Sequence, residues 1–138
     1  MNKEQKQDMM LKIIEDTVTF YGDDPKERRC ISADGNCQYT WGDKHCAIGR
    51  YLKPKYQIET WKENEESVKG LMDCSEDYCE IDWCLRDEVH GLDVEFWADL
   101  QDMHDGRRNW NYEDKGLTLD GEMQCKKMIR NVKDDEYE

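Results

Sequence analysis

Residues 92–105 read LDVEFWADLQDMHD, and their spacing predicts an amphipathic helix. Apolar residues recur every three or four positions, which places them on one face of a helix. That face contains Leu92, Phe96, Leu100 and Met103. Acidic residues lie off that face, at Glu95, Asp99, Asp102 and Asp105. Gly106 comes next and is expected to end the helix.

Helical spacing also occurs on both sides of this stretch. Residues 3–21 carry a stripe that Gly22 and Pro25 should end, made of Leu11, Ile14, Val18 and Tyr21. Residues 71–89 carry a second stripe, made of Leu71, Cys74, Tyr78, Ile81, Leu85 and Val89. Residues 118–133 predict a last helix, with Thr118 as its N-cap. Residues 59–70 predict only a weak helix, and 134–138 an acidic tail.

Residues 29–50 have a different pattern. Asp34-Gly35 and Trp41-Gly42-Asp43-Lys44 are typical of tight turns. The residues around them predict two or three short antiparallel strands, although residues 46–49 are equally consistent with the start of a short helix. We therefore expect an α+β protein, a single domain over 1–138, mainly helical with a small antiparallel β-hairpin after the first helix.

The charge is concentrated in one segment. The chain of 138 residues has 33 acidic and 20 basic residues and a net charge of −13, and residues 59–105 hold 16 of the acidic residues but only 3 basic ones. Ordinary duplex binding through a basic face is not expected, because the phosphates would be repelled. We expect no direct nucleic-acid binding and no membrane span. The polar N-terminus lacks the apolar stretch of a signal peptide, so we expect a cytoplasmic protein.

The acidic segment has two interpretations. Acidic helices are usually solvated faces, and the charge then serves solubility. Alternatively, the segment forms a negative surface for a basic partner, which would speed encounter and favour one orientation. The expected partner contacts are Glu76, Asp77, Glu80, Asp82, Asp87, Glu88, Glu95, Asp99 and Asp102. Trp97 is expected in the core, whereas Trp83 could lie exposed among the acids.

The chain has seven cysteines, an odd number that does not form a complete disulfide set. Free thiols are expected in a reducing cytosol. Cys37, His45 and Cys46 are weak candidates for a zinc site, but the C-x-x-C spacing of structural zinc is missing. Buried thiols are the simpler interpretation. We expect neither a metal nor a cofactor.

A cysteine hydrolase would need Cys46 as nucleophile and His104 as base. Asp105 is the neighbour of His104 on the same helix, which we expect to be poor geometry for orienting the imidazole ring. The simpler interpretation makes Cys46 a small core residue and His104 a helix-terminal group. We therefore expect no enzymatic activity.

Two short motifs allow a comparison with a known family. Cys37 and Tyr39, then Gly42, then Cys46-Ala47-Ile48-Gly49 form one motif, and the L-Q-x-x-H-D sequence of residues 100–105 forms the other. Together with Trp110 and Gly116-Leu117-Thr118, they resemble small uncharacterised proteins of phages and prophages. The motif positions that the resemblance marks are Cys37, Tyr39, Cys46, Gly49, His104 and Asp105. The resemblance implies a phage origin but no activity, because none is established for that family.

Three functions follow as hypotheses, beside a plain structural or regulatory module whose charge only keeps it soluble. The first is a non-enzymatic phage accessory protein that binds and inhibits a host defence or nucleic-acid-handling protein, using its acidic surface as a DNA mimic. The second is a protein that binds or sequesters a small molecule such as a nucleotide signal, in a pocket outside the acidic segment. Its candidate residues are Tyr39, Arg50, Arg107, Arg108 and Trp110. The third and least favoured is a Cys/His or metal-dependent enzyme.

Overall fold

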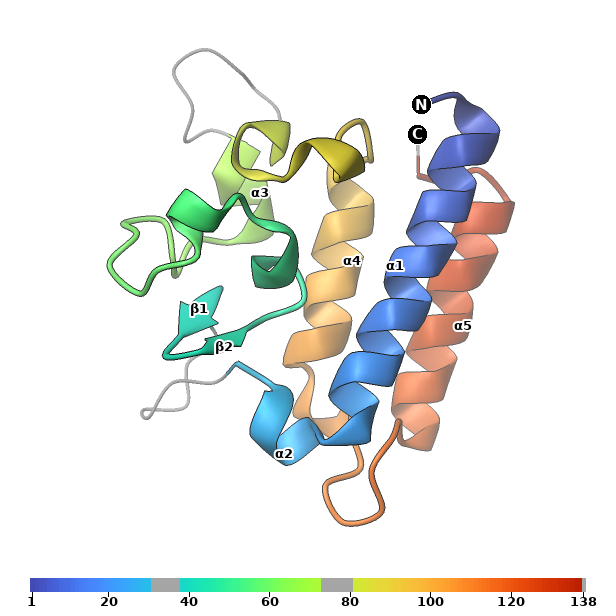
Figure 1. Ribbon diagram of the computed structural model, residues 1–138. Helices are drawn as coiled ribbons and strands as arrows, with labels where there is room; N and C mark the ends of the chain where they lie inside the picture. The colour runs from blue at the N-terminus through green and yellow to red at the C-terminus, as the bar shows by residue number, and fades with distance from the viewer. Residues whose placement is uncertain (31–37, 73–80, 138) are drawn as a thin grey trace.

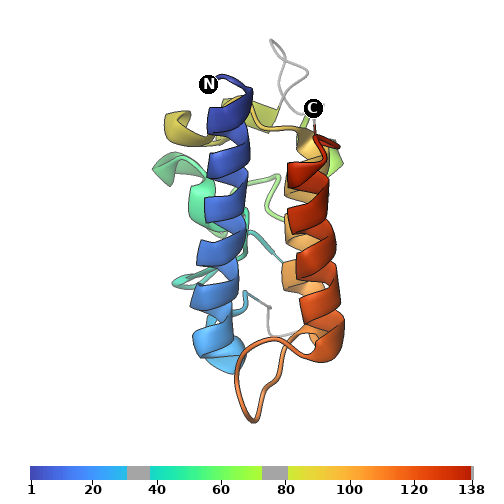
Figure 2. The same cartoon turned by 90° about the vertical axis from the view of Figure 1, so that its right-hand side faces the viewer.

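Three long helices form one side of the molecule in the computed structural model, which describes residues 1–30, 38–72 and 81–137. They are α1 (Lys3–Asp23), α4 (Val94–Asp105) and α5 (Leu119–Lys133). Figures 1 and 2 show the three helices side by side, with both chain ends at the same end of the molecule. A 2.9 Å ion pair between Lys3 Nζ and Asp135 Oδ2 joins the two ends. The helices predicted over 3–21, 92–105 and 118–133 are therefore confirmed.

Local signals in the sequence explain where these helices begin and end. The Asn2 side chain accepts a hydrogen bond from the Gln5 backbone N–H, and the Gln5 side chain accepts one from Asn2 N–H, which forms a capping box at the start of α1. Thr118 Oγ1 accepts the Gly121 N–H at the start of α5, as its N-cap role predicts. α2 (Pro25–Arg28) follows α1 directly, because proline is tolerated in a first turn.

The second side of the molecule lies across α4 and contains a small β-hairpin, as predicted (Figure 1). Strands β1 (Thr40–Trp41) and β2 (Lys44–His45) pair antiparallel around Gly42, whose positive φ of 63° suits glycine. This side also contains the short helix α3 (Val68–Met72). Three short 3-10 helices complete it: η1 (Gly49–Tyr51), η2 (Pro54–Tyr56) and η3 (Ile81–Cys84). η4 (Asp87–Val89) leads into α4, and η5 (Arg107–Asn109) follows it. The predicted Asp34-Gly35 turn lies outside the described residues.

The continuous helix predicted over 71–89 is wrong. α3 ends at Met72, and η3 and η4 are only short turns, although Leu71, Ile81, Leu85 and Val89 are all buried as expected. The backbone from 84 to 86 pairs instead with residues 51–53. Lys53 N–H donates to Cys84 O at 2.9 Å, and Arg86 N–H donates to Tyr51 O at 2.9 Å. These bonds use backbone groups that a helix would need for itself.

The weak helix predicted over 59–70 is confirmed only at 68–70, where α3 begins, and is wrong over 59–67, which form turns and irregular backbone. Their hydrogen bonds go to the hairpin. Asn64 Oδ1 accepts the Thr40 N–H at 2.9 Å, and Asn64 Nδ2 donates to Thr40 O at 3.0 Å. An asparagine side chain that bonds backbone groups in this way competes with helix formation.

Aromatic residues fill the core on both sides of α4. Trp97 is fully buried, as predicted, and packs beside Phe96 and Tyr51. Trp83 is half-buried between Tyr56 and Trp61, so it does not stand exposed among the acids. Within the described ranges, no helix has the length and apolar character needed to cross a membrane.

Candidate functional site

A pocket of about 420 Å³ opens between α4 and the segment that leads into α3. We call it the acidic pocket, because four of its lining residues carry carboxylates: Glu65, Glu66, Asp102 and Asp105. Lys69 is the one cation among its described lining residues. The Lys69 Nζ lies 2.9 Å from Glu95 Oε1, a further carboxylate on α4. Negative charge therefore exceeds positive charge in and around the pocket.

This excess of negative charge affects Asp102. The residue is exposed overall, but its carboxyl group is partly desolvated, and this raises its pKa above the ordinary value, followed by repulsion from Asp105 and Asp99. Lys69 acts in the opposite direction and does not cancel the effect. A cation placed in the pocket would relieve the repulsion between these carboxylates.

The walls of the acidic pocket are held in place by side chains. Asn64, which lines it, fixes β1 through Thr40, as described above. Tyr39 Oη donates to Glu66 O at 2.7 Å, which joins the hairpin to the turn before α3. Gln38 Nε2 donates to Glu65 Oε1 at 2.7 Å. These hydrogen bonds connect the hairpin to the turn before α3, and they fix the positions of the carboxylates in the pocket.

Gln101 joins α4 to the hairpin side. Its Oε1 accepts the Ile48 N–H at 3.2 Å, and its Nε2 donates to Asp105 Oδ1 at 2.7 Å. His104 Nδ1 lies 2.8 Å from the same Asp105 oxygen. One carboxylate oxygen thus receives hydrogen bonds from two side chains of its own helix. The expectation that Asp105 is badly placed to orient His104 is wrong, because at the end of α4 its side chain turns back to the ring.

His104 is a buried neutral imidazole. Its side chain is fully enclosed, and its Nε2 accepts the Cys30 backbone N–H at 3.5 Å, so the proton belongs on Nδ1. Burial lowers its pKa, even though Asp105 acts to raise it. A ring that has both nitrogens engaged and no exposed surface acts here as a structural bridge.

The other described motif positions also meet in this region. Cys46 is fully buried, its Sγ accepts the Gly49 N–H at 3.2 Å, and burial raises the pKa of its thiol. A Cβ on Gly49 would overlap the carbonyl oxygen of Tyr39. Cys37 lies outside the described residues. Tyr39, Cys46 and Gly49 therefore hold the hairpin together, while His104 and Asp105 secure the end of α4.

The catalytic and metal hypotheses gain no support from this arrangement. A buried thiol with a raised pKa is a poor nucleophile. His45 Nδ1 lies 3.0 Å from Thr40 Oγ1. In the parts of the chain that the structure covers, no three His, Cys, Asp or Glu residues are grouped to hold a metal ion.

The predicted partner contacts fall into four groups. Glu76, Asp77 and Glu80 lie outside the described residues. Asp82 is half-buried and accepts the Gly91 N–H, while Asp87 and Glu88 lie beside three cations, Lys53, Lys55 and Arg86. Glu95, Asp99 and Asp102 share one side of α4. The prediction missed Glu65, Glu66 and Asp105 as pocket residues, although the charge count over 59–105 included them.

The five residues of the small-molecule hypothesis are divided among three places. Tyr39 lines the acidic pocket, and the guanidinium of Arg50 stacks 4.1 Å from the Phe20 ring centroid. Arg107, Arg108 and Trp110 do meet, in a second pocket after α4.

No family model, no curated protein and no solved structure matches the chain.

Proposed function

We propose that this protein is a non-enzymatic phage accessory protein that binds and inhibits a basic, nucleic-acid-handling protein of the host. The acidic pocket is the proposed contact, and it would receive a lysine or arginine side chain of that partner. The acidic side of α4 would extend the contact and occupy a surface that otherwise binds DNA.

One observation carries this proposal: four carboxylates line a pocket that has one lysine among its described lining residues. The raised pKa of Asp102 supports the proposal, since it reflects burial first and then repulsion from Asp105 and Asp99, and a bound cation would relieve that repulsion. Glu95, Asp99 and Asp102 add a row of charges on successive turns of α4, spaced by about 5.4 Å per turn.

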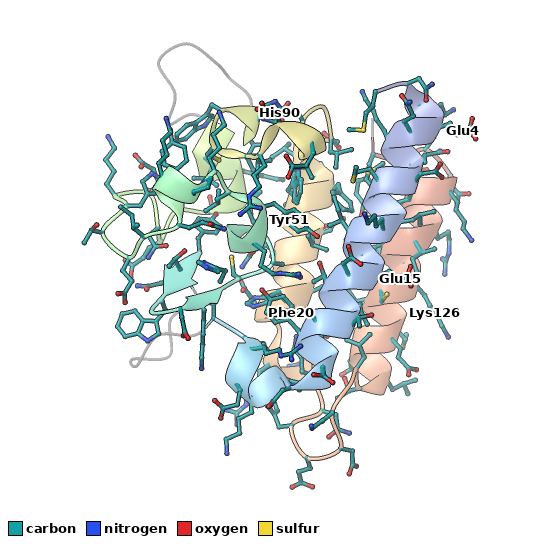
Figure 3. The ribbon with its side chains drawn as sticks, in the orientation of Figure 1. Glu4, Glu15, Phe20, Tyr51, His90 and Lys126 are labelled. Carbon is teal, nitrogen blue, oxygen red and sulfur yellow. The ribbon has the colours of Figure 1, made fainter. Side chains whose placement is uncertain are left out.

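The test is capture of partners from nuclease-treated bacterial extract by the tagged protein, followed by mass spectrometry. The pocket variant E66Q/D102N removes two charges from exposed pocket residues. Its matched control, D8N/E15Q, removes two charges from exposed positions of α1; Figure 3 shows Glu15 on the side of α1 away from the hairpin. We expect a basic DNA-binding protein to be retained by the wild type and the control at low salt, and lost with the pocket variant.

Two further measurements complete the test. Duplex DNA should displace the captured protein, and the purified partner should lose its DNA-dependent activity when the wild-type protein is added. High salt should weaken capture, because the distance over which exposed charges act falls from about 8 Å at 0.15 M ionic strength to about 3 Å at 1 M. Equal capture by E66Q/D102N and the wild type, or no displacement by DNA, would contradict the proposal.

A further inference from the structure

A second pocket, of about 520 Å³, is formed by residues of the segment between α4 and α5. Figure 1 shows that this segment lies at the end of the molecule opposite the termini. We call this second pocket the basic pocket. Its lining residues are Gly106, Arg107, Arg108, Trp110, Tyr112 and Thr118. The only charged groups among these residues are two arginines, in a chain with a net charge of −13. Such a local reversal of charge indicates a site for an anion.

Arg107 and Arg108 are both exposed, and neither takes part in an ion pair within the described residues. They are adjacent on η5, so their side chains enter the same pocket from one short turn. The guanidinium group matches the oxygens of a phosphate through paired N–H donors, and two of them can hold neighbouring phosphate groups.

Tyr112 provides a flat wall that is fixed from behind. Its hydroxyl accepts a hydrogen bond from Arg29 Nη1. Arg29 is itself buried and immobilised at the C-terminal end of α4, where its Nε donates to His104 O at 2.9 Å and its Nη2 to Asp105 O at 2.8 Å. Arg107 lies 6.0 Å from the centre of the Tyr112 ring. An aromatic ring beside arginines is a platform on which a planar base can stack.

Nearby acids do not line this pocket. Glu113 and Asp114 follow Tyr112, and their backbone N–H groups donate to Asn111 Oδ1 in a tight turn. Neither residue is part of the pocket wall. Trp110 closes the inner end, with its indole N–H donating to His104 O at 3.1 Å.

We propose that the basic pocket binds a nucleoside phosphate, with the phosphate groups on Arg107 and Arg108 and the base against Tyr112. This site is independent of the acidic pocket and of the partner proposed above. It shares only the end of α4 with that pocket, since Asp105 lines one and Gly106 the other.

ATP without added metal is the probe, titrated by calorimetry at 0.15 M salt, where the net negative charge of the protein is screened beyond about 8 Å. The variant R107A/R108A removes the two pocket cations, and K53A/K55A removes two cations elsewhere as a charge-matched control. We expect one ATP per chain, an affinity about tenfold or more weaker in R107A/R108A, and little change in K53A/K55A. On ATP addition, the NMR signal of the Trp110 indole N–H should shift.

The contribution of the base is tested with pyrophosphate and the variant Y112L. Loss of the ring should weaken ATP binding at least about fivefold and leave pyrophosphate binding unchanged, because stacking acts on the base alone. Circular dichroism checks that Y112L remains folded. If Y112L does not fold, the affinities of the wild-type protein for ATP and for pyrophosphate are compared instead, and they decide whether the base contributes to binding. Absence of ATP binding, equal loss in K53A/K55A, or ATP binding no tighter than pyrophosphate would overturn the proposal.

Discussion

The two sides of α4 bury their apolar residues equally well but are held together differently. On the α1–α5 side, long helices pack through regular apolar faces, and most backbone hydrogen bonds stay within each helix. On the hairpin side, each strand has two residues, and the chain is joined by side chains that bond to backbone groups. Regular packing spreads its stability over many contacts, whereas the hairpin side depends on a few residues.

The largest expected effect comes from Gly49→Ala. The new Cβ would overlap the Tyr39 carbonyl, and neither backbone can move without breaking the junction of the hairpin with η1. We expect a loss of about 3 kcal/mol or more in the free energy of unfolding, measured by urea denaturation. Gly42→Ala in the same hairpin is the control. Nothing lies within 4 Å of its added Cβ, so the only destabilisation comes from the positive φ. We expect it to lower the free energy of unfolding by about 1–2 kcal/mol. Equal losses would contradict the steric explanation.

Gln101→Leu should have the next largest effect. It leaves the buried Ile48 N–H without its acceptor and takes one donor from Asp105. We expect a loss of about 1–3 kcal/mol in the free energy of unfolding. On the helical side, Gln7 Nε2 also donates to a backbone carbonyl, that of Val132, at 3.1 Å. Asp135 N–H donates to the same carbonyl, so Gln7→Leu should cost less than about 0.5 kcal/mol. A larger loss for Gln7→Leu would reverse the comparison.

The third prediction concerns pH. The pKa of His104 is lowered from its ordinary value of 6.5, so below that pH the unfolded chain takes up a proton that the folded chain resists. Stability should therefore be full above pH 6.5 and fall as the pH drops, by at most about 1.4 kcal/mol per pH unit. Urea denaturation between pH 7.5 and 5.5 measures the fall. The pKa of His45 is lowered too, but His45 is only half-buried and should contribute less than the fully buried His104. The variant His45→Gln should therefore retain most of the pH dependence. NMR titration showing His104 protonated at pH 6.5 in the folded protein would contradict the prediction.

The smallest expected effect is a gain. Because the Asp102 pKa is raised, its charged form opposes folding at neutral pH, and Asp102→Asn should stabilise the protein. Asp102 is exposed, so screening by water limits the gain to about 0.5 kcal/mol or less. The gain should shrink with added salt, and Asp8→Asn on α1 should show none. A loss of stability in Asp102→Asn would mean that its carboxylate makes a favourable contact.

Sequence patterns predicted the helical side well because its signals are local. Periodic apolar residues and the Thr118 N-cap act within one or two turns. They failed over 71–89, where the apolar spacing is compatible with a helix but the backbone pairs with residues far along the chain. The backbone partners of Cys84 and Arg86 depend on how η1 and the residues after it are positioned, and no local pattern contains that information.

The candidate sites were predicted in part for the same reason. The charge count located the acidic region, and Arg107, Arg108 and Trp110 are close enough in sequence to be recognised together. The convergence of Glu65 and Glu66 on Asp102 and Asp105 depends on the turn at 59–67, which was predicted as a weak helix. Likewise, the contact of Asp105 with His104 requires the side-chain geometry at a helix end, which residue spacing does not give.

The bond from Asn64 to Thr40 has a consequence for hydrogen exchange. The Thr40 amide proton is held by Asn64 Oδ1 and the Tyr39 amide proton by Asn64 O, so neither depends on the partner strand. Both protons should exchange with solvent whenever residues 59–67 move away from the hairpin, even while the helices remain intact. The exchange rates of these two amides therefore report how often one wall of the acidic pocket opens.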